Sequence, residues 1–135
     1  MSETAEQSIT KGEGYAVANL SDLGEGPGFR KIRKELGVTA FGANAIVLPP
    51  SYETGSHYHD EQEELYFLHH GRIEMEFGDG STHELSPGGL ARVDAATVRK
   101  VRNPSDSEEA VYVVVGGKDG YIGRDGRQPE GETRR

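Results

Sequence analysis

Histidine and acidic side chains gather in one short stretch of the sequence. Four of the five histidines lie within fourteen residues, at positions 57, 59, 69 and 70, and no lysine or arginine occurs between residues 51 and 70. In an extended strand alternate side chains share a face, so His57 and His59 would present neighbouring rings on one side. After a loop over residues 60–63, the next strand would return Glu64 to that side. Two imidazoles and a carboxylate in a site closed by sheet favour iron, manganese, nickel, zinc or copper over calcium or magnesium.

A solvated polar strand face is the alternative interpretation of a His-X-His pair, and it is the more common one when such a pair occurs alone. The carboxylate of Glu64, five positions after His59, favours a metal site here. For the rest of the cluster we expect ordinary surface roles. His69 should face away from Glu64, and the acidic residues 60–63 should form a solvated loop.

Short strands separated by turns must position these side chains. The 19 glycines and 6 prolines fall between short apolar runs at fairly even intervals, a pattern typical of an all-β domain. The predicted strands cover residues 15–18, 29–33, 38–48, 56–59, 63–69, 72–78, 82–85, 90–93, 98–103 and 110–116. Val111–Val115 is almost continuously apolar, so we expect a second sheet or a partner subunit to cover both its faces. Arg30–Leu36 could instead form a helix, which Gly28 and Gly37 would limit to two turns.

The length of 135 residues predicts a single domain with one hydrophobic core. Leucine, isoleucine, valine and phenylalanine are concentrated in its middle, because only Ile9 of this set precedes residue 15 and none follows residue 123. We therefore predict a disordered N-terminal tail over residues 1–14, a folded β domain over 15–123 and a disordered C-terminal tail over 124–135.

Net charge and composition exclude several classes of function. The formal net charge of −8 argues against nucleic acid and anionic membranes as partners, because both are bound through clustered lysine and arginine. The absence of cysteine excludes a disulfide framework, a cysteine zinc site and a thiol nucleophile. No stretch approaches about 18 apolar residues, and the first residues lack the basic and apolar regions of a signal peptide. The expected location is therefore cytoplasmic.

The spacing of the cluster resembles the first signature of the cupins, Gly-(X)5-His-X-His-(X)3,4-Glu-(X)6-Gly. The matching residues are His57, His59, Glu64 and Gly71, while Ser51 stands at the position of the first glycine. Elements of the second cupin signature follow in order as Gly80, Pro87-Gly88-Gly89 and Asn103. The resemblance covers about residues 38–116. It implies a double-stranded β-helix of the cupin or jelly-roll type, commonly a homodimer, with its site inside the barrel.

Arg99 occupies the position at which the resemblance places the third metal-binding histidine. A guanidinium cannot coordinate a cation, so three arrangements remain open. In the first, His57, His59 and Glu64 hold a divalent ion while Arg99 turns aside to grip an anionic ligand. In the second, Arg99 pairs with Glu64 in a metal-free pocket. In the third, His70 replaces the missing ligand.

These observations predict a small cupin that binds a small organic anion in its barrel, with a divalent metal as a possible cofactor. Arg99 and Tyr66 are the candidate ligand-binding residues, and His57, His59 and Glu64 the candidate metal ligands. One alternative is a metal-dependent dioxygenase or isomerase of a small metabolite. Another is a metal-free binding or sensor module with an Arg99–Glu64 pair. We expect Asn103 to satisfy backbone groups at a strand end.

Overall fold

The computed structural model describes residues 9–129, whose regular secondary structure consists mainly of short antiparallel strands. In chain order the elements are β1 (Thr10–Gly12), β2 (Tyr15–Val17), a 3-10 turn (Leu20–Asp22), β3 (Gly28–Arg30), α1 (Ile32–Leu36), β4 (Gly42–Leu48), β5 (Tyr58–His59), β6 (Glu63–His70), β7 (Ile73–Phe77), β8 (Thr82–Leu85), β9 (Leu90–Val93), β10 (Arg99–Arg102), β11 (Ala110–Gly117) and β12 (Gly126–Arg127). The only α-helix within this part of the chain has five residues. No helix there is long and apolar enough to span a membrane.

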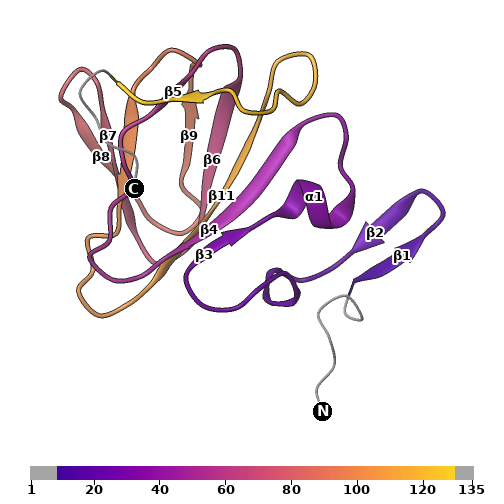
Figure 1. The fold of residues 1–135 in the computed structure, drawn as a ribbon. Coiled ribbons are helices and arrows are strands. Elements are labelled where there is room, and N and C mark those ends of the chain that lie inside the picture. The colour runs from indigo at the N-terminus through magenta and orange to yellow at the C-terminus, as the bar shows by residue number, and fades with distance from the viewer. Residues whose placement is uncertain (1–8, 130–135) are drawn as a thin grey trace.

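Two antiparallel sheets form the body of the protein. The larger has the strand order β3-β4-β11-β6-β9 and the smaller the order β10-β7-β8. Figure 1 shows the two sheets facing each other, with β5 crossing one end of the space between them. β5 pairs with β12, and β1 pairs with β2 in a separate hairpin. This is the double-stranded β-helix that the resemblance to the cupins implies.

Alternation along β6 explains how one strand serves both the core and the site. Glu64, Tyr66 and Leu68 are buried, whereas the residues between them are exposed. The inward side chains join a core drawn from both sheets. Its buried members are Ile46, Leu48, Tyr66, Leu68, Ile73, Met75, Val93, Val101, Ala110 and Tyr112. The turn after β6 requires Gly71, which has a φ of 79° and where a Cβ would lie 2.7 Å from the carbonyl oxygen of Glu109.

All ten predicted strands have a counterpart in the structure, with two substantial differences. The strand predicted at residues 38–48 begins only at Gly42. The strand predicted at residues 29–33 ends at Arg30, and α1 follows it. Gly37 ends α1 in a left-handed conformation with a φ of 77°, so the glycine that limits the helix acts as the sequence indicates. The prediction of a strand through residue 33 is therefore wrong. The local helical pattern prevails where β3 no longer has a partner on β4.

Parts of the two predicted tails form strands where the structure describes them, and the disorder of the tails stays a prediction. Residues 1–8 and 130–135 lie outside the described residues. Thr10–Gly12 forms β1, however, and Figure 1 shows the β1–β2 hairpin extending away from the barrel. At the other end, Gly126 and Arg127 pair with β5. The distribution of large apolar residues does not indicate either strand, because neither is held by apolar burial. β1 is held by backbone pairing with β2, and β12 by backbone pairing with β5 and by the neighbouring Asp125.

The apolar run Val111–Val115 lies at the centre of the larger sheet, between β4 and β6. Tyr112 faces the core and is buried, whereas Val111, Val113, Val114 and Val115 are half-buried. Val113 pairs with Phe67, a side chain that is 39% exposed on the outer face of the sheet. Cover on both faces is therefore incomplete in a single chain.

Ser51 allows a stability prediction, because it has a φ of 64° where the cupin signature has glycine. The left-handed conformation costs a residue with a side chain about 1–2 kcal/mol, and a glycine avoids this cost. Glycine loses more conformational entropy on folding, but that loss is smaller than the cost avoided. We expect Ser51→Gly to raise the free energy of unfolding by about 0.5–1 kcal/mol. Urea unfolding would measure it. Ser56→Gly, at a position without a positive φ, should instead destabilise the protein, and equal effects at both positions would contradict the explanation.

Candidate metal centre

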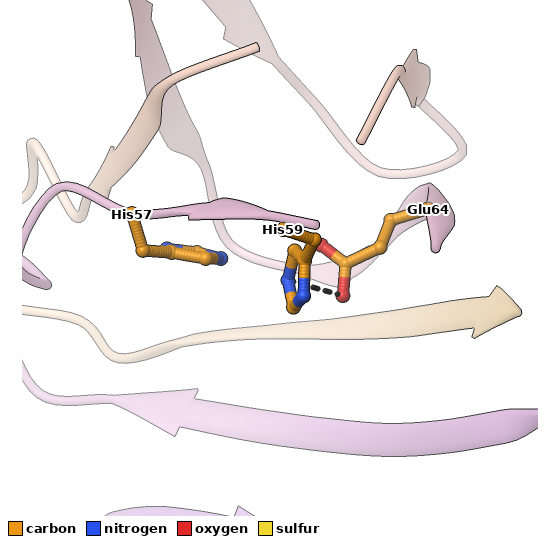
Figure 2. A group of neighbouring side chains, drawn as sticks. All are labelled: His57, His59 and Glu64. Carbon is orange, nitrogen blue, oxygen red and sulfur yellow. Dashed lines mark ion pairs between the residues drawn. The ribbon is translucent and has the colours of Figure 1, made fainter. Parts of the chain in front are cut away.

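Three side chains from the predicted cluster converge at one end of the barrel. One donor atom each from His57, His59 and Glu64 lies within 4.8 Å of the other two. Figure 2 shows both imidazoles projecting from the same side of their strand, with the Glu64 carboxylate meeting His59 from β6. The His57 and His59 ring centroids are 5.2 Å apart. The alternation expected from sequence therefore produces a compact group of possible ligands.

Backbone pairing fixes these positions. His57 forms an antiparallel bridge with Arg99, in which each backbone N–H donates to the other residue's carbonyl at 2.9 Å. His59 pairs with Gly126 of β12. Glu64 pairs with Val93 of β9 and with Gly116 of β11. Neighbouring strands thus hold all three ligand candidates, which reduces the entropy lost on binding.

Arg99 lies behind Glu64 and is completely buried. Its Nη2 donates to Glu64 Oε1 at 3.0 Å, and its Nη1 donates to the Thr97 carbonyl at 2.5 Å. Longer contacts from Nη1 reach the carbonyls of Asp94 and Ala95. The guanidinium is thus engaged by the protein, and Arg99 is not among the residues lining the cavity. Its donors point to Glu64, to backbone oxygens and, from Nε at 3.4 Å, to the Tyr66 hydroxyl. That Arg99 grips a ligand directly stays a prediction.

The structure distinguishes the other two arrangements, a substitute ligand at His70 and an Arg99–Glu64 pair. His70 is exposed at the far end of β6 and lines a different cavity, so it is not a substitute ligand. The Arg99–Glu64 pair of the second arrangement is present. It occupies only Oε1, while Oε2 lies 3.2 Å from His59 Nε2. The pair and the three-ligand group therefore coexist, although the first two arrangements were expected to exclude each other.

Tyr66 is also part of this group. Its hydroxyl donates to Glu64 Oε1 at 2.8 Å, and its ring stacks on Tyr112 with centroids 5.8 Å apart. Burial raises the pKa of Tyr66 well above its usual value, so the hydroxyl stays protonated and keeps donating. Tyr66 lines the cavity, and its hydroxyl orients Glu64. Its role in ligand binding stays a prediction.

Glu64 is held in its charged form. Burial alone would raise its pKa, but the close His59 ring, the charge of Arg99 and the Tyr66 hydroxyl together lower it from 4.5 to about 2. The carboxylate is therefore available as an anionic ligand across the physiological pH range.

This lowered pKa predicts an acid-sensitive contribution to stability. Because the folded-state pKa is below the unfolded one, the contribution is present above about pH 4.5 and is lost as the pH falls toward 2. In urea unfolding at pH 7, 4.5 and 3, the free energy of unfolding should fall less with decreasing pH for Glu64→Gln than for the wild type. The same loss in both proteins would show that other carboxyl groups account for it.

Asp125 and Gln62, neither of which is expected from the sequence patterns, contact the other side of the His59 ring. Asp125 Oδ2 accepts hydrogen bonds from the backbone N–H groups of Glu61 and Gln62, each at 2.8 Å, and lies 3.8 Å from His59 Nδ1. Burial would raise the pKa of Asp125, but these N–H groups lower it. Gln62 Nε2 lies 3.2 Å from Nδ1. No signal near residue 125 links it to the histidines, since the two come together only through contacts between distant segments, among them the pairing of β12 with β5.

His59 Nε2 supports a metal centre on structural grounds. It is buried without a hydrogen-bond partner among the described residues, although Glu64 Oε2 is close. Gln62 Oε1 is likewise buried and unpartnered. A half-turn of the Gln62 amide would let Oε1 accept from Nδ1–H, leaving the Nε2 lone pair for an ion. The donor set thus fits a divalent transition metal.

A cavity of about 940 Å³ opens beside these residues. His57, His59, Glu64 and Tyr66 line it, together with apolar side chains of β4 and β11 that include Ile46, Leu48 and Tyr112. The volume is that of a small-molecule site. The candidate ligands therefore face a space that a small organic molecule can enter.

Sequence comparison identifies the family. The profile of the cupin domain matches residues 45–116, more than half of the chain. The protein therefore belongs to the cupin family. A comparison with curated proteins gives no match.

Solved structures agree on the fold. A cupin protein from Bacteroides fragilis is 21% identical, with a TM-score of 0.67 over 79% of this chain and 86% of that one. A protein with a double-stranded β-helix domain from Klebsiella pneumoniae is 16% identical, with a TM-score of 0.64 over 95% and 96%. A sugar phosphate isomerase of the cupin superfamily from Silicibacter pomeroyi is 24% identical, with a TM-score of 0.61 over 78% of this chain. The chain spans 60% of that isomerase's length.

Proposed function

We propose that this cupin binds a small organic anion in its barrel through a divalent transition metal held by His57, His59 and Glu64. The observation that carries the proposal is the group of three donor atoms within 4.8 Å at the wall of the cavity. When bound, the metal would supply a Lewis acid with coordination positions open to the ligand. Arg99 and Tyr66 fix one oxygen of Glu64, while Gln62 and Asp125 orient the ring of His59.

Metal analysis tests this proposal. Protein purified without chelator or metal-affinity tag should contain close to one transition-metal ion per chain, and titration of chelator-treated protein with Zn²⁺, Mn²⁺ or Fe²⁺ should restore it. Loss of an outer-shell partner commonly costs 10–100-fold in affinity, so Glu64→Gln, which alters a ligand, should cost more than about 100-fold. Glu63→Gln is the matched control, because Glu63 is exposed on the opposite face of β6. Wild-type protein that binds no metal in either experiment would overturn the proposal.

The second candidate is a metal-free binding or sensor module, and the Arg99–Glu64 ion pair favours it. The guanidinium partly neutralises the Glu64 carboxylate. It also occupies the position at which a fourth protein ligand would increase the affinity for metal. In this case Arg99→His should bind metal where the wild type does not. If both proteins bind one ion with equal affinity, Arg99 does not govern occupancy and this second candidate fails.

Catalysis as a metal-dependent isomerase or dioxygenase extends the first proposal. Two histidines and one carboxylate leave positions for substrate, as such chemistry requires. The Silicibacter pomeroyi neighbour is described as a sugar phosphate isomerase, which makes phosphorylated sugars reasonable first substrates to assay. Activity that disappears in Glu64→Gln but not in Glu63→Gln would support a metal-dependent reaction. Activity unaffected by either substitution would exclude the site as its source.

A homodimer is proposed from the outer face of the larger sheet. Phe67 pairs with Leu90 and with Val113, and Leu65 lies two residues before Phe67 on the same face. Leu65, Phe67 and Leu90 are 45%, 39% and 60% exposed. Light scattering after size-exclusion chromatography should give twice the chain mass, and Phe67→Ser with Leu90→Ser should reduce it to a monomer. A wild-type monomer at micromolar concentration would refute this.

A cytoplasmic location without nucleic-acid or membrane partners remains a prediction from charge and composition.

A further inference from the structure

We propose that the rim of the cavity is an anion site that takes a phosphate group of the ligand, while the rest of the ligand extends toward His57 and Glu64. The site consists of Lys31, Arg33, Lys34, Arg124 and Arg127, called the basic rim below. This inference rests on the proposed function, because it concerns the same cavity. It adds the chemical class of the ligand and the end at which its charge is recognised.

The first observation is a reversal of charge. The whole chain has 23 acidic and 15 basic side chains, yet among residues 9–129 the cavity is lined by the five cations of the basic rim and by two acids. Both acids, Glu64 and Asp125, are buried and engaged in the contacts described above. In a protein of net charge −8, a cavity lined this way selects anions.

The basic rim is assembled from two segments distant in sequence. Lys31, Arg33 and Lys34 belong to α1 and the residue before it, and Arg124 and Arg127 belong to the chain after β11. The Arg33 guanidinium carbon lies 4.0 Å from the centre of the Tyr121 ring, which joins the two segments. Figure 1 shows α1 and the loop after β11 on the same side of the barrel. A ligand entering there meets cations from both segments.

Three of these cations are not neutralised by the protein. Lys31, Lys34 and Arg124 are exposed, and their side chains form no ion pair with any residue in the range 9–129. Among the other surface cations, Arg72, Arg92 and Arg102 each contact a carboxylate. Lys11 and Lys118 are also exposed and form no ion pair with the described residues, but they do not line the cavity. Within the rim, Arg127 pairs with Asp60 at 2.6 Å. Three unpaired positive charges at one opening are an electrostatic cost unless an anion binds there.

The number and arrangement of these cations favour a phosphate monoester over a single carboxylate. A phosphate group carries about −1.5 to −2 charges at neutral pH and three acceptor oxygens, so it can accept from donors on both segments. A lone carboxylate carries one charge and would leave most of the rim unneutralised. The inner end of the cavity has the imidazoles of His57 and His59, which suit a hydroxyl or carbonyl group of the ligand.

The test uses inorganic phosphate on chelator-treated full-length protein, followed by ¹H–¹⁵N NMR. Treatment with chelator removes any metal that could bind phosphate by itself. We expect saturable shifts in residues 31–34 and 121–127. Each exposed charge removed should weaken binding about threefold, so Lys31→Gln, Lys34→Gln and Arg124→Gln combined should weaken it about 30-fold.

A matched triple variant controls for net charge. Lys11→Gln, Arg72→Gln and Arg92→Gln remove the same three charges at positions that do not line the cavity, and should weaken phosphate binding less than threefold. Equal losses in the two triple variants would overturn the inference, as would shifts confined to other surfaces. Acetate binding as tightly as phosphate would overturn the assignment to a phosphate group.

The outcome is distinguishable from that of the metal proposal. Glu64→Gln should keep phosphate binding while losing metal, because Glu64 is not in the basic rim. Phosphate binding at the rim of a wild-type protein that takes no metal would support this inference and refute the metal centre. Stoichiometric metal together with no phosphate binding would support the metal centre and refute this inference.

Discussion

Replacing Arg99 with methionine is expected to lower the free energy of unfolding by about 3–5 kcal/mol, because it leaves Glu64 as a buried carboxylate without its cation. Arg99 has no exposed surface, and Glu64 is only 8% exposed. Methionine has a comparable length and fills much of the same volume, so the loss reports on charge rather than on a cavity. Urea unfolding at pH 7 would measure it.

A double-mutant cycle separates the ion pair from the other contacts of Arg99. If the unpaired carboxylate causes the loss, Arg99→Met combined with Glu64→Gln should be more stable than Arg99→Met alone. If the double variant is no more stable, the backbone carbonyls of Asp94, Ala95 and Thr97 that Arg99 contacts account for the loss. That result would show that Arg99 acts on the loop before β10 and not on Glu64.

The second large effect is expected at Asn103, whose side chain has no exposed surface. Its amide donates to the carbonyls of Leu48, Pro49 and Glu108, and its oxygen accepts from the backbone N–H of Ser105. Asn103→Ala removes these partners in a place that water does not reach. We expect a loss of about 3 kcal/mol in the free energy of unfolding, measured by urea or thermal denaturation.

Asn44→Ala is the matched control for Asn103. Asn44 is a half-buried asparagine of β4, and no hydrogen bond of its side chain is found among the described residues. Asn44→Ala should lower the free energy of unfolding much less than Asn103→Ala. Similar losses at the two positions would mean that asparagine volume, and not the bonds between the β4 end and the loop before β11, determines stability.

The sequence determined most of the fold and the candidate ligands. Strand positions follow from apolar runs and turn residues, which are local properties of the chain. His57, His59 and Glu64 could be grouped because strand alternation and one short loop fix their relative faces. The role of Asn103 at a strand end follows from the same local reasoning. The signature around Gly71 added the family, which the profile match over residues 45–116 confirms.

Only the tertiary structure decided what surrounds those ligands. Asp125 reaches His59 from 66 residues along the chain, and Arg99 turns its guanidinium toward Glu64 and the backbone instead of the cavity. The basic rim likewise joins residues 31–34 to residues 124–127. Local periodicity specifies which face a side chain occupies, but contacts between distant segments depend on which strands pair and on how buried charges find partners. Those are properties of the packed chain, so no pattern within a short stretch of sequence contains them.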